Sequence, residues 1–145
     1  MSVRTLLVAS DDADLRTFVG ITLEGEGFYV YEARNAVTVL KLAREALPEV
    51  ILLDAKMPGI AGGDVVQVLR DEDETANVPM ILIDGVLDSA EIARANAVIR
   101  RPFGPDELKV TVAQALQAVI LPDSKPSENT ELSGGAVPLT TPKGV

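Results

Sequence analysis

Residues 50–62 read VILLDAKMPGIAG, and this segment gives the clearest indication of the fold. Its four leading residues, Val50 to Leu53, are all apolar and branched, which is typical of a strand buried on both faces of a parallel sheet. The acid Asp54 follows this run directly, and a Met-Pro-Gly turn at residues 57–59 prevents the strand from continuing. The stretch therefore predicts a central strand with a carboxylate at its carboxyl end.

Similar apolar runs lie on both sides of this stretch. Four further strands are expected, at residues 5–9, 28–33, 80–83 and 97–99. Segments with apolar residues at helical spacing separate them, and this alternation is the mark of βαβ units. The sequence predicts an α/β fold with a doubly wound, five-stranded parallel sheet, (βα)5.

Local signals predict where the helices begin and end. Asn35 can cap the second helix, whose apolar stripe extends to Leu47. Asp64 is expected to open the third helix, and Asp88 with Glu91 forms a capping box for a short fourth helix.

Length and composition describe one domain and a tail. Of the 145 residues, 47% are hydrophobic, enough for one core, which we place in residues 1–121. Residues 122–145 are rich in Pro, Ser, Thr and Gly and are expected to be a disordered tail or linker. The chain has no cysteine, no targeting stretch and no long apolar run, which predicts a soluble protein of the cytoplasm. A net charge of −9 argues against direct binding to nucleic acid or to an anionic membrane.

Acidic residues follow the expected strands. Asp11 and Asp12 come after the first strand, Asp54 after the third and Asp84 after the fourth, while Arg101 follows the fifth. The carboxyl ends of parallel strands meet at one edge of a sheet, where these acids would need a cation between them or a basic side chain beside them. Mg²⁺ suits such oxygen ligands, and Arg101 could be the basic partner. The alternative, that these acids are solvated loop residues, stays open.

The loop at residues 54–62 resembles the phosphoacceptor loop of response regulator receiver domains, the CheY-like superfamily. Asp11 and the Arg101-Pro102-Phe103 motif fall where that family has an acid and its Lys-Pro-Phe, so the resemblance covers residues 3 to about 121. It implies a flavodoxin-like fold in a bacterial signalling phosphoprotein that is not an enzyme.

The same resemblance implies roles for individual residues. Asp54 would accept a phosphoryl group from a histidine kinase or phosphotransfer protein, and Mg²⁺ would bind Asp11, Asp54 and the backbone carbonyl of Lys56. The face made by the fourth helix, fifth strand and fifth helix would contact a downstream protein or form a homodimer.

Several residues depart from the family pattern. Ser10 replaces the first acid of the acidic pair, which weakens the expected Mg²⁺ site unless Asp12 compensates. Asp84 stands where the family has Thr or Ser, and an ionised carboxylate cannot donate to a phosphoryl group. Arg101 replaces the family's Lys, and Val98 replaces its switch aromatic. The chain between the fourth and fifth strands is also shorter than the pattern by more than one helical turn.

Asp84 and Arg101 change together, which suggests that they interact. We hypothesise that they form a bidentate pair in the space where a phosphoryl group would lie. The alternative is that both drifted independently and point to solvent.

Three classes of function follow. The first is a phosphorylatable receiver that uses Asp54 and Mg²⁺. The second is a phosphorylation-independent pseudo-receiver that acts as a protein-interaction or dimerisation module. The third, an enzyme or nucleotide-binding module, is disfavoured because the first strand is followed by acids instead of a glycine-rich phosphate cradle, and because the chain has no His.

Overall fold

The computed structural model of this chain describes residues 4–57, 62–84 and 95–120. The strands are β1 (Arg4–Ala9), β2 (Phe28–Ala33), β3 (Val50–Asp54), β4 (Met80–Ile83) and β5 (Ala97–Ile99). The described helices are α1 (Ala13–Glu24), α2 (Ala36–Ala46), α3 (Gly62–Asp71) and α5 (Pro105–Ile120).

The five strands form one parallel sheet in the order β2-β1-β3-β4-β5, which confirms the predicted flavodoxin-like α/β fold. The strand order reverses at β1, because β2 pairs on one side of it and β3 on the other. In open parallel sheets a ligand crevice forms outside the carboxyl ends of the strands at this point. The fold therefore predicts that the functional residues lie just after β1 and β3.

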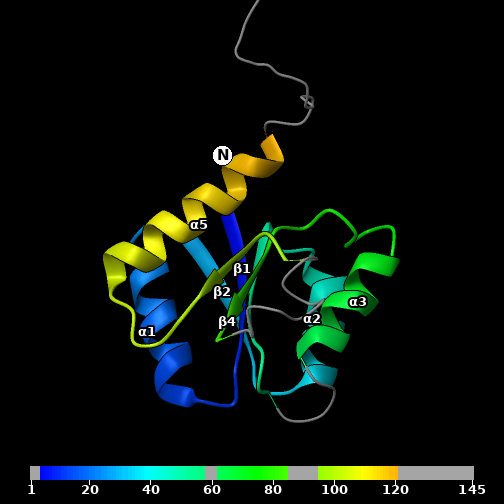
Figure 1. The fold of residues 1–145 in the computed structure, drawn as a ribbon, viewed down its shortest axis with the longest axis horizontal. Helices are drawn as coiled ribbons and strands as arrows, with labels where there is room; N and C mark the ends of the chain where they lie inside the picture. The colour runs from blue at the N-terminus through cyan, green and yellow to red at the C-terminus, as the bar shows by residue number, and fades with distance from the viewer. Residues whose placement is uncertain (1–3, 58–61, 85–94, 121–145) are drawn as a thin grey trace, which may run out of the picture.

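Helices cover both faces of the sheet (Figure 1): α1 and α5 pack on one face, and α2 and α3 on the other. Alternate residues of the strands serve the two cores, so that Leu52 faces α1 and α5 while Leu53 faces α2 and α3. Both are fully buried, and each contributes roughly 1.5–3 kcal/mol of burial free energy. This double-sided burial is why the strands read as continuous apolar runs.

Two expected helix limits are wrong. Leu47 does not continue the apolar stripe of α2, because it has φ 46° at the C-cap and is half exposed. Pro48 follows it and disfavours helical backbone at residue 47. Helix α3 begins at Gly62, two residues before Asp64. The predicted cap at Asn35 is confirmed, since its Oδ1 accepts a hydrogen bond from the Thr38 amide at 2.9 Å.

Three other expectations lie outside the described residues. These are the capping box of Asp88 and Glu91, the shortened fourth helix or its loop between β4 and β5, and the tail at residues 122–145. No helix in the described part of the chain is both long enough and apolar enough to cross a membrane.

Candidate functional site

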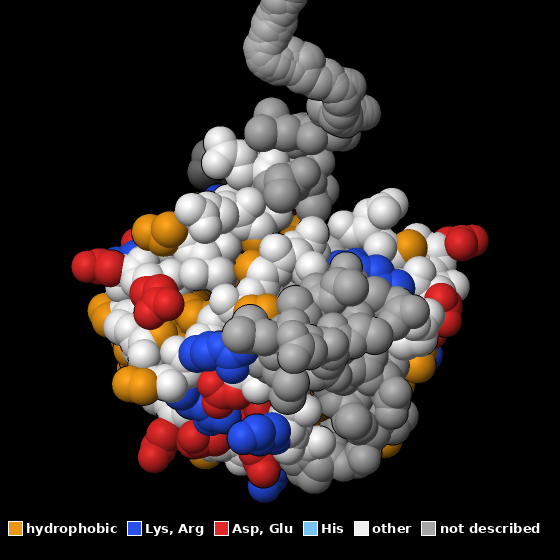
Figure 2. Space-filling view, in the orientation of Figure 1, with side chains coloured by type: hydrophobic (Ala, Val, Ile, Leu, Met, Phe, Trp, Pro, Cys, Tyr) orange, Lys and Arg blue, Asp and Glu red, His pale blue; other side chains and the backbone are white. Residues whose placement is uncertain are grey.

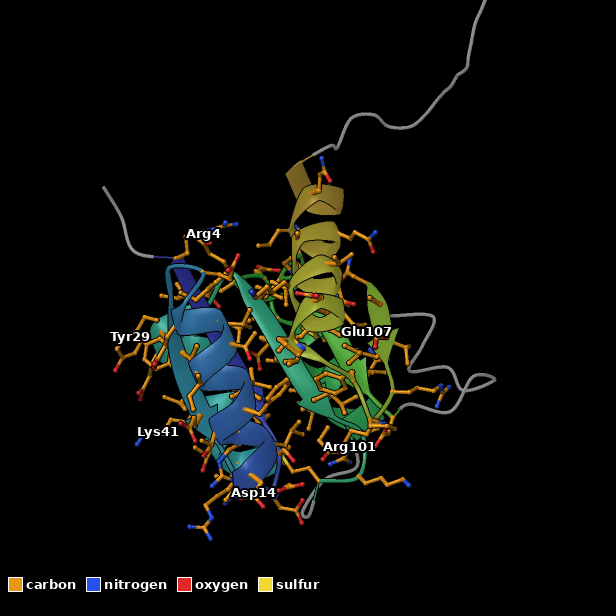
Figure 3. All side chains as sticks on the ribbon, turned by 90° about the vertical axis from the view of Figure 1, so that its left-hand side faces the viewer. Arg4, Asp14, Tyr29, Lys41, Arg101 and Glu107 are labelled. Carbon is orange, nitrogen blue, oxygen red and sulfur yellow. The ribbon has the colours of Figure 1, made fainter. Side chains whose placement is uncertain are left out.

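The polar residues that follow β1, β3, β4 and β5 meet at one edge of the sheet. In Figure 3, Arg101 lies toward the same end of the molecule as Asp14 at the start of α1, while Arg4 at the start of β1 lies at the opposite end. Figure 2 shows acidic and basic side chains gathered at the lower end of the molecule, toward which β1 runs in Figure 1. The predicted convergence of Asp54 and Arg101 is confirmed by a 3.4 Å contact between Oδ2 and Nη2.

Asp54 ends β3 and has only 2% of its side chain exposed. Its Oδ1 accepts a hydrogen bond from the Lys56 amide at 3.0 Å, and its Oδ2 accepts one from the Ser10 hydroxyl at 2.7 Å. Because Arg101 also contacts Oδ2, both oxygens of this buried carboxylate have partners within the chain.

Ser10 is fully buried and uses each of its polar groups. Its amide donates to the Ala33 carbonyl, its carbonyl accepts from Arg16 Nη1 at 2.7 Å, and its hydroxyl accepts from the Asp12 amide while donating to Asp54. A buried carboxylate at this position would repel Asp54, whereas the hydroxyl bonds to it. Ser10 replaces the first acid of the family's acidic pair, and this replacement gives Asp54 a hydrogen-bond donor.

Asp12 is the N-cap of α1. Its Oδ1 accepts hydrogen bonds from the amides of Asp14 and Leu15, as Asp commonly does at this position. Its Oδ2 lies 3.5 Å from Arg101 Nη1. One oxygen thus holds the helix start and the other faces the site. Asp11, the residue before it, is exposed at the same edge.

Asp84 follows β4 and has φ 60°, a left-handed conformation that Asp tolerates better than most residues. Its Oδ1 accepts from the Arg101 amide at 2.9 Å, and its Oδ2 accepts from Arg101 Nε at 2.7 Å. The hypothesised Asp84–Arg101 pair is therefore present. It differs from a guanidinium fork in that one of its two donors is the backbone.

This pairing fixes the charge of both groups. Partial burial raises the pKa of Asp84, but hydrogen bonds from the Arg101 amide and guanidinium, with the charges of Arg101 and Lys56, lower that pKa below its ordinary value. The hydrogen bond to Asp84 raises the pKa of Arg101 despite partial burial, and the charges of Asp54, Asp84 and Asp12 raise it further. Asp84 is therefore an anion at neutral pH and cannot donate a hydrogen bond.

Two residues of α1 support the site although the sequence did not predict this role for them. Arg16 holds the Ser10 carbonyl and forms an ion pair with Glu32 on β2, and Phe18 packs against Phe103 with ring centroids 5.9 Å apart. A helical Arg and an aromatic residue are too common to single out without coordinates. Val98 is partly buried against the core on the α2 and α3 side, where a ring would be expected from the resemblance.

The residues as arranged do not fit a Mg²⁺ ion well. Mg²⁺ requires nearly octahedral oxygen ligands at short distance. Here Asp54 Oδ2 is already bonded to Ser10 and faces Arg101, while Asp12 Oδ1 is committed to α1. Among the described residues, no three acidic, His or Cys side chains are placed to hold a metal.

Comparisons with known proteins agree with the fold. A family model described as the response regulator receiver domain matches residues 6–113. The chain belongs to this family, and it is a receiver domain of the two-component signalling class.

Two curated relatives are named as regulators. "DNA-binding response regulator MtrA" of Mycobacterium leprae is 33% identical over 85% of this chain and 54% of that protein. "Phosphate regulon transcriptional regulatory protein PhoB" of Pseudomonas aeruginosa is 28% identical over 79% of this chain and 52% of that protein. The chain thus spans about half the length of these relatives.

This chain also matches two solved structures over almost the whole length of those structures. A response regulator from Chloroflexus aurantiacus superposes with a TM-score of 0.75 at 26% identity, covering 80% of this chain and 99% of that one. The chemotaxis response regulator CheY4 of Vibrio cholerae gives a TM-score of 0.74 at 24% identity over 79% and 99% of the two chains, which supports the fold alone.

Proposed function

We propose that this chain is a receiver module whose signalling state is set by contacts around Arg101 and not by phosphorylation of Asp54. The observation that carries the proposal is the engagement of Asp54, whose two carboxylate oxygens have three partners within the chain, Ser10, Lys56 and Arg101. In this role the domain acts as a protein-interaction or dimerisation module. The absence of cysteine supports a cytoplasmic place for it.

Electrostatics support the same proposal. A phosphoryl group on Asp54 would need Arg101 as its partner, yet Arg101 is already bonded to Asp84 through its amide and Nε. Breaking a charge-assisted hydrogen bond costs roughly 1.5–3 kcal/mol. If Asp84 then faced the phosphoryl group unpaired, each pair of like charges near 4 Å would add roughly 4 kcal/mol at an effective dielectric near 20. Together these costs disfavour the phosphorylated state strongly.

Intact mass measurement tests the proposal. The chain is incubated with acetyl phosphate and Mg²⁺ and weighed beside the Asp54→Asn variant. We expect no phosphoryl adduct on either protein at saturating donor. An adduct on the wild type that disappears in Asp54→Asn would refute the proposal.

That refuting outcome is the second candidate function, a conventional phosphoacceptor. It is favoured by the position of Asp54, which ends β3 next to the reversal of strand order and lies inside the matched family region. Its partners would be a histidine kinase or phosphotransfer protein and Mg²⁺. In either function we propose that a downstream protein binds the face containing β5 and α5, where Val110 is 54% exposed.

A further inference from the structure

We infer that the Arg101 guanidinium takes the place of the divalent cation in this site, so that the wild-type chain is closed to Mg²⁺ and removal of Arg101 opens it. The inference deepens the proposed function, since it concerns the same residues. It is measured by metal binding, and therefore it can fail independently of any phosphorylation result.

The first support is the distribution of contacts around Arg101. Each guanidinium nitrogen faces a different carboxylate: Nε lies 2.7 Å from Asp84, Nη2 lies 3.4 Å from Asp54 and Nη1 lies 3.5 Å from Asp12. These acids come from the ends of β4, β3 and the loop after β1. One side chain therefore joins the strand ends that a bound cation would join.

The second support is charge. The three carboxylates and Arg101 carry a formal net charge of −2. The positive charge of Lys56 also helps to lower the pKa of Asp84. Without Arg101, the carboxylates would repel one another at an edge where Asp54 is almost wholly buried. Such a cluster is stabilised by a cation, and Mg²⁺ is a hard divalent ion that takes carboxylate oxygens as ligands.

The third support is the anchoring of Arg101. Its backbone amide and its Nε both bond to the same Asp84 carboxylate, and nearby Phe103 packs on Phe18 of α1. The Arg101 side chain is one third exposed, and Asp84 holds both its Nε and the backbone amide of the same residue. An entering ion would have to displace a tethered cation, which is harder than filling open space.

Thermal unfolding and calorimetry test the inference on the full chain. Wild type, Arg101→Ala and the control Arg100→Ala are unfolded in MgCl₂ and in NaCl of equal ionic strength. Arg100 is exposed and adjacent, so its variant makes the same change in net charge outside the cluster. We expect a lower Tm for Arg101→Ala in NaCl that recovers in MgCl₂, with no specific Mg²⁺ effect on the wild type or Arg100→Ala.

Titration calorimetry with MgCl₂ gives the binding constants directly. We expect the Kd of Arg101→Ala for Mg²⁺ to be about tenfold or more lower than that of the wild type, because one competing positive charge is gone. Equal Mg²⁺ affinity in the two proteins would overturn the inference, as would an Arg101→Ala protein that folds yet ignores Mg²⁺. If Arg101→Ala does not fold, Arg101→Gln replaces it. Whatever the variants do, tight Mg²⁺ binding by the wild-type chain is sufficient to overturn the inference.

The results also separate the inference from the proposed function. A wild type that binds Mg²⁺ but acquires no phosphoryl adduct would remove the inference and leave the proposed function. A wild-type chain that does not bind Mg²⁺ in calorimetry but acquires a phosphoryl adduct on Asp54 would refute the proposed function and leave the inference.

Discussion

The Ser10 hydroxyl stabilises the buried Asp54 carboxylate by donating a hydrogen bond to it. It donates to Asp54 Oδ2 at 2.7 Å and accepts from the Asp12 amide at 3.1 Å, so that it links the acceptor carboxylate to the start of α1. An unpaired buried polar group costs about 1–3 kcal/mol. Ser10 therefore stabilises the fold as well as shaping the site.

We predict that Ser10→Ala lowers the free energy of unfolding by about 1–3 kcal/mol, because Asp54 loses a donor and the Asp12 amide loses an acceptor. Urea denaturation measures the change. Thr17→Ala, at an exposed position of α1, is the control and should shift stability by less than about 0.5 kcal/mol. Equal stability of the two variants would show that the hydrogen bonds of Ser10 contribute nothing net.

The ionised Asp84 carboxylate should make the stability of the fold depend on pH. Because its folded pKa lies below the ordinary value near 3.9, the ionised carboxylate stabilises the fold above that pH, and this contribution is lost as pH falls through the folded pKa. Asp84→Asn removes the charge and keeps a residue that tolerates φ 60°. The wild type should be more stable than Asp84→Asn at pH 7, and the difference should shrink below about pH 4.

Urea denaturation at a series of pH values checks this prediction. Asp73→Asn, at an exposed loop position away from Arg101, serves as the control for removal of an acid. A constant difference between wild type and Asp84→Asn from pH 7 to pH 3 would mean that the Arg101 pairing contributes no pH-dependent stability.

The pairing of Asp84 with Arg101 was predictable because two unusual residues follow neighbouring strands of a parallel sheet. Its form was not predictable. The left-handed backbone of Asp84 turns one carboxylate oxygen toward the Arg101 amide, and no local sequence signal specifies that angle. The reach of Arg101 to Asp12 likewise depends on side-chain conformation.

At the scale of elements, strands were easier to predict than helix ends. β2, β4 and β5 have the limits expected from the sequence. Full burial of β4 leaves no room for polar residues, whereas the edge strand β2 carries an exposed Tyr29 and Glu32. Helix ends depend on the competition among several possible caps. Asn35 caps α2 as expected, whereas α3 starts at Gly62, before the expected Asp64. The backbone of Leu47 is no longer helical, because Pro48 follows it.

The start of α1 allows an element-scale prediction that separates capping from ion pairing. Asp12→Ala should destabilise the chain by about 1 kcal/mol, because two amides of the first turn lose their acceptor. Asp12→Asn keeps a capping oxygen and loses only the contact with Arg101, at a side chain that is 45% exposed. Such exposed pairs contribute little, so Asp12→Asn should cost less than about 0.5 kcal/mol.

Urea denaturation of both variants decides the point. The smaller effect of Asp12→Asn would identify Asp12 chiefly as a helix cap. If Asn cost as much as Ala, the charge near Arg101 would be the larger contribution, and the capping interpretation would be wrong.

At the scale of the whole molecule, the two hydrophobic cores hold the strand ends in register while the polar edge joins them through side chains. Residues from the end of β3 and from the loops after β1, β4 and β5 contact one another there, although up to 89 positions separate them in sequence. A change in this cluster therefore alters the contacts of several elements at once. Such shared contacts give a receiver one physical route by which a change at the site reaches other elements.

Reversal of Asp84 and Arg101 to the residue types of the family tests whether these two residues block the site. We predict that the double variant Asp84→Thr with Arg101→Lys acquires a phosphoryl adduct from acetyl phosphate and Mg²⁺, because it regains a hydroxyl donor and loses the Asp84–Arg101 pair. Thr is β-branched and disfavours φ 60°, so the end of β4 must also relax, and stability should fall by about 1–3 kcal/mol. Intact mass measures labelling, circular dichroism verifies folding, and Asp54→Asn in the same background should abolish the adduct. A folded double variant that stays unlabelled would show that Asp84 and Arg101 are not what blocks the site.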